Sequence, residues 1–359
     1  MLQHPSIIAG PLLALLLLLS CSSGEEILKE EIPPVLPEEK IAVSFSGRID
    51  LVETKAQGKA GTSGEETPET QTLRKDVNVT IRAYKQAEAG SVGATPQDCR
   101  DYLAGGDGSL TVKGGGEEML LAAGTYTFYA LSVNAAGDTV PPALTSETSA
   151  ETNELKNNTD YLYCAVTQQI ESKPEEKQNV PLTFTRLASR IQITVTGTGG
   201  DDKITAATAP TITLPLTNPA GSKITLGVND PIGQYPVATN TTEGDITGYT
   251  TLKSAGDITN GFTSGCILLP MTAGQKLPVR IVFPSITFNG LAPQTDKLYT
   301  ADIITPEGGF VSGKQYNYTV NITGNEIGFI RLGVTSWDIK PGELPDSSIE
   351  EDYQESYRY

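Results

Sequence analysis

The sequence predicts an all-β protein, and three observations support this fold class. Apolar and polar residues alternate with a period of two in segments that recur from residue 41 to residue 339, as in sheets with one buried face. The chain contains 36 glycines and 23 prolines and few long helical patterns, so turns are frequent. Its 359 residues fit about two domains after a leader is removed.

The chain opens with a segment that resembles an export signal. Leu12–Leu19 is continuously apolar but shorter than the roughly 20 residues that span a bilayer. The order Leu18-Leu19-Ser20-Cys21 resembles a bacterial lipobox, although the leader has His4 and no Lys or Arg. We therefore expect a lipoprotein signal peptide at 1–20 and a lipid on Cys21. A plain secretory signal with an incidental Cys is the alternative.

An acidic, proline-rich segment follows at residues 21–39. Such a composition buries too little apolar surface to fold, so we expect a linker between the lipid and the first domain. Acidic residues directly after a lipidated Cys also resemble the surface-export signal of Bacteroidetes lipoproteins. An ordinary solvated linker explains the composition equally well.

A first run of predicted strands covers residues 40–172. The apolar residues of the opening strand share one face: Ile41, Val43 and Phe45. Val77–Tyr84 alternates in the same way, and Gly124–Val133 continues the run. These segments predict an N-terminal β domain.

A second run of predicted strands covers residues 181–340. The charged segment 171–180 has almost no apolar residues and is the best internal boundary. The final strand pattern, Leu332–Ile339, contains the only Trp, Trp337, which we expect in the core. Residues 341–359 are acidic and Tyr-bearing, and we expect a disordered tail there.

Composition argues against several classes of function. A net charge of −17 disfavours nucleic acid, whose phosphates need Lys and Arg, and anionic membrane surfaces. The only His is His4 in the leader, so the mature chain has no imidazole base and no His ligand for zinc. A catalytic carboxylate pair is formally open, but no segment singles one out. We therefore expect no enzyme activity, no metal and no cofactor.

Three cysteines follow the lipobox. Cys99 and Cys164 lie in the same predicted domain, so they are the candidate disulfide pair in an oxidising compartment, and Cys266 is left over. Buried thiols fit the sequence as well.

Several motifs occur in an order that is known from one bacterial family. The lipobox and linker lead to the strand Lys40–Phe45, and Thr54-Lys55-Ala56 follows where that family usually has Thr-Arg-Ala. The other matching segments are Ala123–Ala130, Phe184–Ile191, Gly313–Ile322 and Trp337. Over residues 18–340 the chain thus resembles the fimbrillin family, the type V pilins of Bacteroidetes. The resemblance implies two tandem antiparallel β-sandwich-like domains.

The resemblance also implies a way of assembling. In this family a protease typically cuts after a basic residue at the end of the first strand, and a strand of a neighbouring subunit fills the groove. Arg48 and Lys55 are the basic candidates. Lys55 replaces the family's Arg, so an Arg-specific protease would favour Arg48. Solvent-facing cations explain both residues as well.

The end of the chain offers the donor strand. Phe329–Ile339 is the better candidate, and the tail after Pro341 is a weaker one because its alternation is weak. An ordinary edge strand paired within the chain explains Phe329–Ile339 too. Without a cut, the protein would keep its lipid and serve as an anchor or terminal subunit.

Two functions follow from these expectations. The first is a fimbrial subunit or fimbrium-associated lipoprotein of the outer membrane, with other fimbrial subunits and a host or bacterial surface receptor as partners. The second is a monomeric surface lipoprotein that binds glycans or peptides through its 14 Tyr or Trp337.

Overall fold

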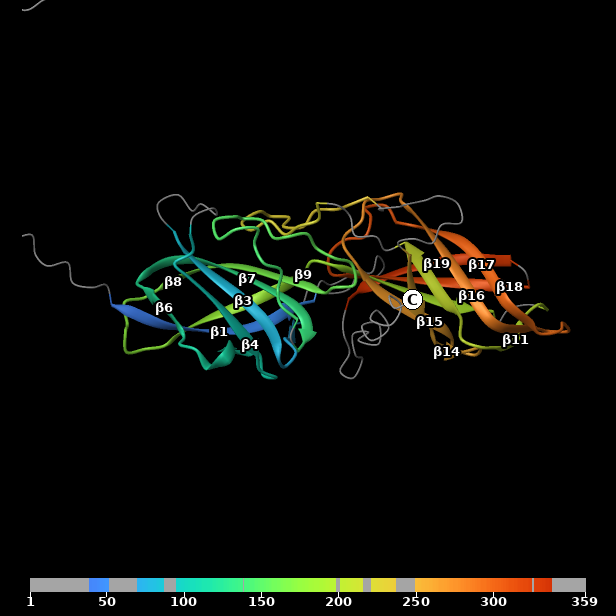
Figure 1. Cartoon of the computed structure of the whole chain (residues 1–359), viewed down its shortest axis with the longest axis horizontal. Coiled ribbons are helices and arrows are strands. Elements are labelled where there is room, and N and C mark those ends of the chain that lie inside the picture. The colour runs from blue at the N-terminus through green and yellow to red at the C-terminus, as the bar shows by residue number, and fades with distance from the viewer. Residues whose placement is uncertain are drawn as a thin grey trace, which may run out of the picture. The chain divides into compact units, whose positions relative to one another are not determined.

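The regular structure consists almost entirely of β-strands (Figure 1). The computed structural model describes residues 39–51, 70–86, 95–137, 139–197, 201–215, 221–236, 249–324 and 326–337. These ranges contain nineteen strands, one short 3-10 turn and no α-helix, so the predicted all-β class is confirmed. Nowhere in them is there a helix with the length and apolar character needed to cross a membrane.

Nine strands form one sheet in the first half of the described chain. They are β1 (Lys40–Asp50), β2 (Thr70–Thr72), β3 (Val77–Lys85), β4 (Asp98–Ala104), β5 (Ser109–Val112), β6 (Met119–Ala122), β7 (Gly124–Ala136), β8 (Tyr161–Ile170) and β9 (Gln178–Arg186). The 3-10 turn η1 (Lys113–Gly115) precedes β6. Neighbouring strands follow the order β2-β1-β5-β4-β3-β7-β8-β9, and β6 also pairs with β1. A further pairing between β1 and β9 closes the sheet on itself.

The alternation that predicted these strands also produces their core. Every second side chain of β1 is buried from Ile41 to Ile49, and β3 and β7 contribute Val79 and Phe128 to the same apolar cluster. Leu182 of β9 completes it from the other side of β1. Because the sheet closes on itself, these inward side chains pack against one another in a sandwich-like interior.

Two five-stranded sheets form the second half, also in a sandwich-like arrangement. Their strands are β10 (Ser189–Thr196), β11 (Ile204–Ala207), β12 (Thr211–Pro215), β13 (Tyr249–Lys253), β14 (Ala255–Asp257), β15 (Gly261–Leu268), β16 (Lys276–Phe288), β17 (Gln294–Ile304), β18 (Lys314–Thr323) and β19 (Glu326–Ser336). One sheet has the order β14-β15-β10-β18-β19, and the other has β11-β16-β12-β13 with β17 on β16. Ile193 of the first and Phe283 of the second belong to one buried cluster.

The segment expected to separate two domains instead connects two strands of the first sheet. β9 begins at Gln178 and pairs with both β8 and β1, so residues 171–177 form a hairpin connection and residues 178–180 belong to β9. The chain passes to the next sheet at Leu187 and Ala188, between β9 and β10. A charged hairpin connection has the composition of a linker, which explains why the sequence suggests a domain boundary there. The division into domains 40–172 and 181–340 stays a proposal, and this topology moves its boundary to Leu187.

The expected disulfide between Cys99 and Cys164 is wrong. Cys99 lies on β4 and Cys164 on β8, and strands β3 and β7 lie between them in the sheet. Three strand spacings place them about 14 Å apart, whereas a disulfide needs Cα atoms within about 7 Å. Both are free thiols, Cys99 exposed and Cys164 buried, and burial raises the pKa of Cys164 to about 12.

Several predicted features lie outside the described residues. They are the signal peptide 1–20, Cys21, the linker as far as residue 38, Lys55 and the tail 341–359.

Candidate functional site

Strand β1 is paired with neighbouring strands along both edges. One edge runs parallel to β9, with Val43–Ile49 opposite Gln178–Phe184. The other edge is antiparallel to three short strands in succession: β6 pairs with Lys40–Val43, β5 with the middle of β1, and β2 with Arg48–Asp50. The first strand of the sheet is therefore an interior strand.

The inward side chains of β1 are almost completely removed from water. They are Ile41, Val43, Phe45 and Ile49, each at most 3% exposed. The ring of Phe45 makes edge-to-face contacts with Tyr102 at 5.3 Å and Phe128 at 5.5 Å between centroids. Burial also raises the pKa of the Tyr102 hydroxyl, which keeps it neutral. Side chains of this size each contribute about 1.5–3 kcal/mol when buried, so the four contribute about 6–12 kcal/mol.

Gly47 continues the inward face where no side chain fits. A Cβ at this position would lie 2.5 Å from Leu73 Cδ1 and 3.2 Å from Phe184 Cε2. The Gly47 amide also donates to the carbonyl of Gly108 at 2.7 Å. The packing around β1 therefore depends on the shape of this backbone as well as on its apolar side chains.

Arg48, predicted to end the first strand, lies within it. The alternation continues to the buried Ile49, and β1 ends only at Asp50. The Arg48 main chain has Thr72 on one side and Thr183 on the other, and its exposed side chain donates from Nε to Thr183 Oγ1 at 3.2 Å. The Arg48–Ile49 peptide bond is thus held inside a stretch that is paired on both sides.

Strand β19 lies in the opposite situation. It pairs only with β18 and forms an edge of its sheet in the described residues. Leu332 is 36% exposed and Val334 is 43% exposed. The predicted closing strand Leu332–Ile339 is therefore not a core strand in this stretch, although Trp337, which follows β19, is buried as predicted.

A buried ion pair connects the end of β9 with Trp337. Arg186 Nε lies 3.1 Å from Asp160 Oδ2, and Asn134 donates to the same oxygen from Nδ2 at 2.8 Å. Arg186 Nη1 donates to the Trp337 carbonyl at 3.0 Å, and the guanidinium carbon lies 4.8 Å from the Trp337 ring centroid. Because both charged groups are buried, each depends on the other for compensation.

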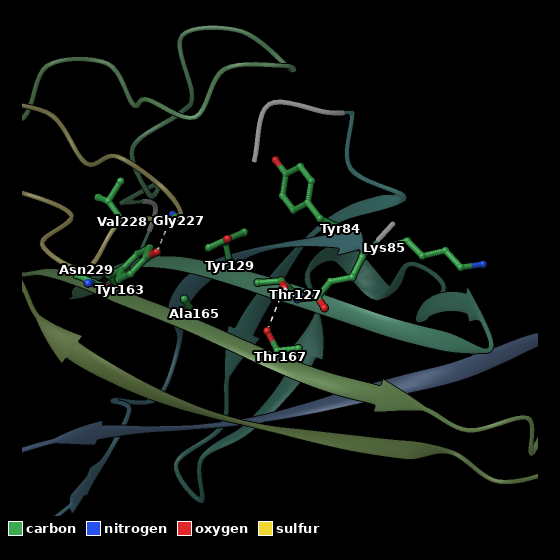
Figure 2. Close-up of a pocket in the computed structure, with 11 residues that line it drawn as sticks. Tyr84, Lys85, Thr127, Tyr129, Tyr163, Ala165, Thr167, Gly227, Val228 and Asn229 are labelled. Atoms are coloured by element: carbon green, nitrogen blue, oxygen red, sulfur yellow. Dashed lines mark hydrogen bonds between the residues drawn. The ribbon is translucent and has the colours of Figure 1, made fainter. Parts of the chain in front are cut away.

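A hollow of about 320 Å³ opens on the outer face of β3, β7 and β8 (Figure 2). Its lining includes Tyr84, Tyr129 and Tyr163 from the three strands. Gly227–Asn229, from a segment far along the chain, form its rim. Burial raises the pKa of all three tyrosines, and that of Tyr163 to about 12. The lining combines aromatic rings with polar groups that are uncharged except for Lys85.

The part of the chain that the structure describes holds no group of three or more His, Cys, Asp or Glu side chains arranged around a possible metal ion.

Two features of these sites were missed from the sequence. The parallel pairing of β1 with β9 is one, although Val180, Leu182 and Phe184 alternate directly after the charged segment and would have extended the first sheet. The hollow is the other. Its only sequence signal is Ala165, a small residue between Tyr163 and Thr167 on the outward face of β8.

Comparison with known proteins agrees with the fold. A family model described as fimbrillin-like matches residues 63–337. No curated protein matches the chain. A crystal structure of a candidate cell adhesion protein from Bacteroides ovatus is similar at 15% identity, with a TM-score of 0.52, covering 84% of this chain and 99% of that chain. One from Bacteroides uniformis is similar at 16% identity, with a TM-score of 0.50, covering 84% and 100%.

These solved structures share the fold, and the family model spans most of the chain. The chain therefore belongs to the fimbrillin-like family, which supports a fimbrial or adhesive role at the cell surface.

Proposed function

We propose that this protein is a fimbrial subunit that assembles when its strand β1 is replaced by a strand from a neighbouring subunit. One observation carries the proposal: β1 is buried on its inward face and paired along both edges. Removing it would leave unpaired main-chain groups on β9 and on β2, β5 and β6, around an apolar groove. A strand from another molecule would restore both ladders and the core.

The bounds of β1 favour Lys55 over Arg48 as the processing site. A cut after Lys55 would release Lys40–Asp50 in one piece. A cut after Arg48 would leave the buried Ile49 on the body of the subunit, and its scissile bond is paired on both sides. Proteases bind extended, unpaired substrates, so a cut at Arg48 requires local opening of the sheet.

Lipidation of Cys21 would set the location and timing of assembly. A signal peptide at 1–20 followed by an acylated Cys21 would hold the precursor on the outer membrane, facing outward. Either candidate cut would remove the lipid together with β1. An uncut copy would stay attached and serve as an anchor or terminal subunit. The partners are other fimbrial subunits and a receptor on a host or bacterial surface.

The donor segment lies near the C-terminus in this proposal. Phe329–Ile339 overlaps β19, which is already paired with β18 from Lys314 to Thr323, so donation from it would uncover β18. The tail 341–359 is the other candidate donor. Deleting 341–359 would abolish assembly if the tail donates and would leave it intact if β19 does.

The decisive experiment treats the purified full chain with an Arg-specific or a Lys-specific protease. We expect fibres in electron micrographs and subunits that begin at residue 56, or at residue 49 if Arg48 is used. Lys55→Gln and Arg48→Gln should each block one cut, with Lys113→Gln and Arg74→Gln as matched controls. Fibres whose subunits begin at Cys21, or no fibres with either protease, would contradict strand exchange.

The alternative is a monomeric surface lipoprotein that binds glycans or peptides, and the hollow on β3, β7 and β8 is the observation that favours it. Saturable binding by a chain that never forms fibres would support this alternative. The family favours a non-enzymatic role in both cases.

A further inference from the structure

We propose that the hollow on the outer face of β3, β7 and β8 is a binding site for one uncharged sugar residue, such as the terminal unit of a surface glycan. Binding in the hollow is independent of strand exchange, because the hollow lies on the face opposite to the core that holds β1. It therefore applies to single subunits and to fibres alike.

A small side chain, that of Ala165, forms the floor of the hollow. Ala165 is exposed on β8 and lies directly opposite Tyr129 of β7. Its neighbours on the same face, Tyr163 and Thr167, are both larger. Alanine is depleted in strands, where larger side chains cover the pleated surface. The gap above Ala165 is therefore an open space between larger groups, as Figure 2 shows.

Tyrosine rings form the apolar wall. Tyr84 and Tyr129 meet edge to face at 5.6 Å, and Tyr129 and Tyr163 stack at 6.5 Å between centroids. The Tyr163 hydroxyl accepts a hydrogen bond from the Gly227 amide at 3.3 Å. Neither the Tyr84 nor the Tyr129 hydroxyl has a hydrogen-bond partner among the described residues. Both can therefore donate to a ligand or accept from it.

Hydroxyl and amide groups lie beside the rings on the same face, because Thr127 is paired with Tyr84 on one side and with Thr167 on the other. Gln86 donates from Nε2 to Thr127 Oγ1 at 3.0 Å, and Thr127 Oγ1 lies 3.0 Å from Thr167 Oγ1. These hydrogen bonds orient the three side chains, from Gln86 just after β3 to Thr127 of β7 and Thr167 of β8. Unused lone pairs on Thr167 and the carbonyl oxygen of Gln86 remain to accept from ligand hydroxyls.

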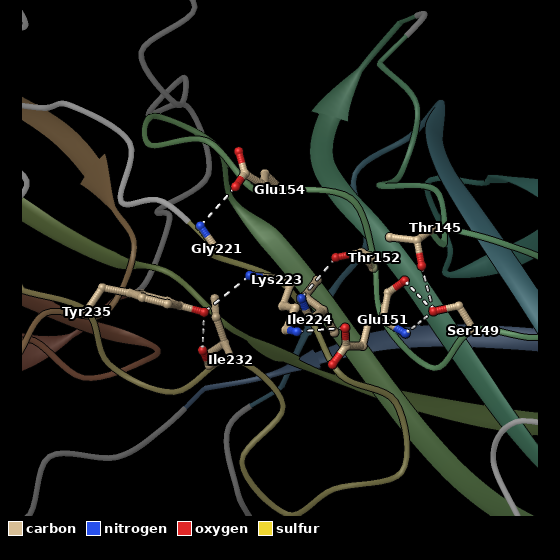
Figure 3. Close-up of polar contacts among 10 residues, drawn as sticks. All are labelled: Thr145, Ser149, Glu151, Thr152, Glu154, Gly221, Lys223, Ile224, Ile232 and Tyr235. Atoms are coloured by element: carbon tan, nitrogen blue, oxygen red, sulfur yellow. Dashed lines mark hydrogen bonds and ion pairs between the residues drawn. The ribbon is translucent and has the colours of Figure 1, made fainter.

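The rim is held before any ligand arrives. Residues 221–236 are tied to residues 145–154 by a network of polar contacts (Figure 3). Thr152 Oγ1 accepts from the Ile224 amide at 2.9 Å, and Lys223 Nζ lies 2.6 Å from Glu151 Oε2. The Leu226 amide donates to the Ala150 carbonyl at 2.8 Å, next to the rim residue Gly227. A rim fixed in this way loses little conformational entropy on binding.

Charge and size select the ligand class. Among the described residues of the lining, Lys85 is the only charged one, and its ammonium points away from Thr127 and Thr167 in Figure 2. An anionic ligand would therefore face no cation among these described residues, in a chain with a net charge of −17. Small-molecule sites start at about 300 Å³ and join an apolar surface to a few polar groups. An uncharged sugar has an apolar face and a ring of hydroxyls, which match the tyrosine rings and the polar groups beside them.

The test measures binding to the purified full chain by saturation-transfer NMR and by titration. The probes are methyl β-D-galactoside, methyl α-D-mannoside, methyl α-L-fucoside and N-acetyl-D-glucosamine. N-acetylneuraminic acid and the neutral peptide acetyl-Ala-Pro-Ala-amide are the competing classes. We expect at least one neutral sugar to bind saturably with millimolar affinity, and neither competitor to bind.

Variants locate the binding. Ala165→Trp fills the hollow and should abolish binding. Tyr129→Phe and Thr167→Val each remove one hydroxyl and should weaken binding about three- to tenfold, as for a lost hydrogen bond. Thr300 lies exposed on β17 and provides matched controls, Thr300→Trp and Thr300→Val, that should bind as the parent does.

Three results would overturn the assignment: no binding by any neutral sugar, binding that survives Ala165→Trp, or binding of the peptide or the anionic sugar instead. Fibre formation by these variants is a separate readout. A failure of strand exchange therefore leaves the sugar measurement standing, and the reverse also holds.

Discussion

The first and last described strands of this chain differ in their pairing and in their burial. β1 has partners on both edges and a fully buried inward face, whereas β19 has a partner on one edge and exposes Leu332 and Val334. Both strands are 11 residues long. They differ in the number of neighbouring strands with which each one pairs.

The two strands differ in when they leave main-chain groups open to a strand from another molecule. An edge strand exposes unpaired main-chain groups at all times, so another strand can pair with it without any prior change. An interior strand exposes none until it is removed, and its removal then uncovers two edges and a groove at once. An assembly that must wait for a protease fits the second kind.

The largest expected effect comes from emptying the core under β1. Phe45→Ala should lower the free energy of unfolding by about 3–5 kcal/mol, because it removes a buried ring that contacts Tyr102 and Phe128. Leu332→Ala on β19 should change it by less than about 1 kcal/mol, because that side chain already meets water. Urea titration of both variants measures the contrast. Similar losses in the two variants would erase the distinction between the strands.

A slightly smaller effect is expected at the contact between β9, the parallel partner of β1, and Trp337, which follows β19. Arg186→Met should destabilise the fold by about 3 kcal/mol, because Asp160 would be left buried without its cation. It should also release Trp337, whose carbonyl accepts from Arg186. Thermal unfolding followed by Trp337 fluorescence reports both changes.

The matched control for this variant is Lys276→Met. Lys276 lies 3.6 Å from Asp302 with its side chain 71% exposed, so its loss should have little effect. Equal effects of the two variants would show that the buried pair does not stabilise the end of β9.

The sequence predicts the strands well because alternation is a local property. Ile41, Val43 and Phe45 are buried as their spacing indicates, and the Trp337 side chain is in the core. The same spacing continues to Ile49, so the sequence also indicates that Arg48 lies within the strand and not at its end. The family resemblance was readable because it rests on the order of such local patterns.

Pairing between distant segments has no comparable local signal. Nothing in Val180, Leu182 or Phe184 states that their strand returns beside β1 in parallel, and the charged stretch before them has the composition of a linker. The order of strands also decides which cysteines are close, and it separates Cys99 from Cys164 by two intervening strands. The hollow depends on Gly227 reaching β8 from far along the chain, so no single segment encodes it.

A moderate effect is expected from adding one carbon to each strand. Gly47→Ala should cost about 1–3 kcal/mol, because the new Cβ would lie 2.5 Å from Leu73 Cδ1. Gly333→Ala on β19 should be neutral or slightly stabilising, because among the described residues its Cβ would meet only the Asn317 carbonyl oxygen, at 3.9 Å. Chemical denaturation of the pair measures both. A neutral Gly47→Ala would mean that β1 shifts easily in its groove.

The smallest expected effect is a pH dependence that reports whether β1 is in place. Tyr102 packs against Phe45, and burial raises the pKa of its hydroxyl above the ordinary value of about 10. The folded state therefore disfavours the phenolate. The stabilisation is complete below pH 10 and is lost as the pH rises from there toward the folded pKa. At pH 10.5 an unfolded phenol gains about 0.8 kcal/mol by ionising, which the folded one does not. Tyr102→Phe should remove that loss between pH 9 and pH 10.5.

A mature chain cut after Lys55 and freed of β1 should show a Tyr102 that titrates nearer its ordinary range, by absorbance at alkaline pH. An unchanged titration after removal of β1 would mean that β1 does not shield this side of the core.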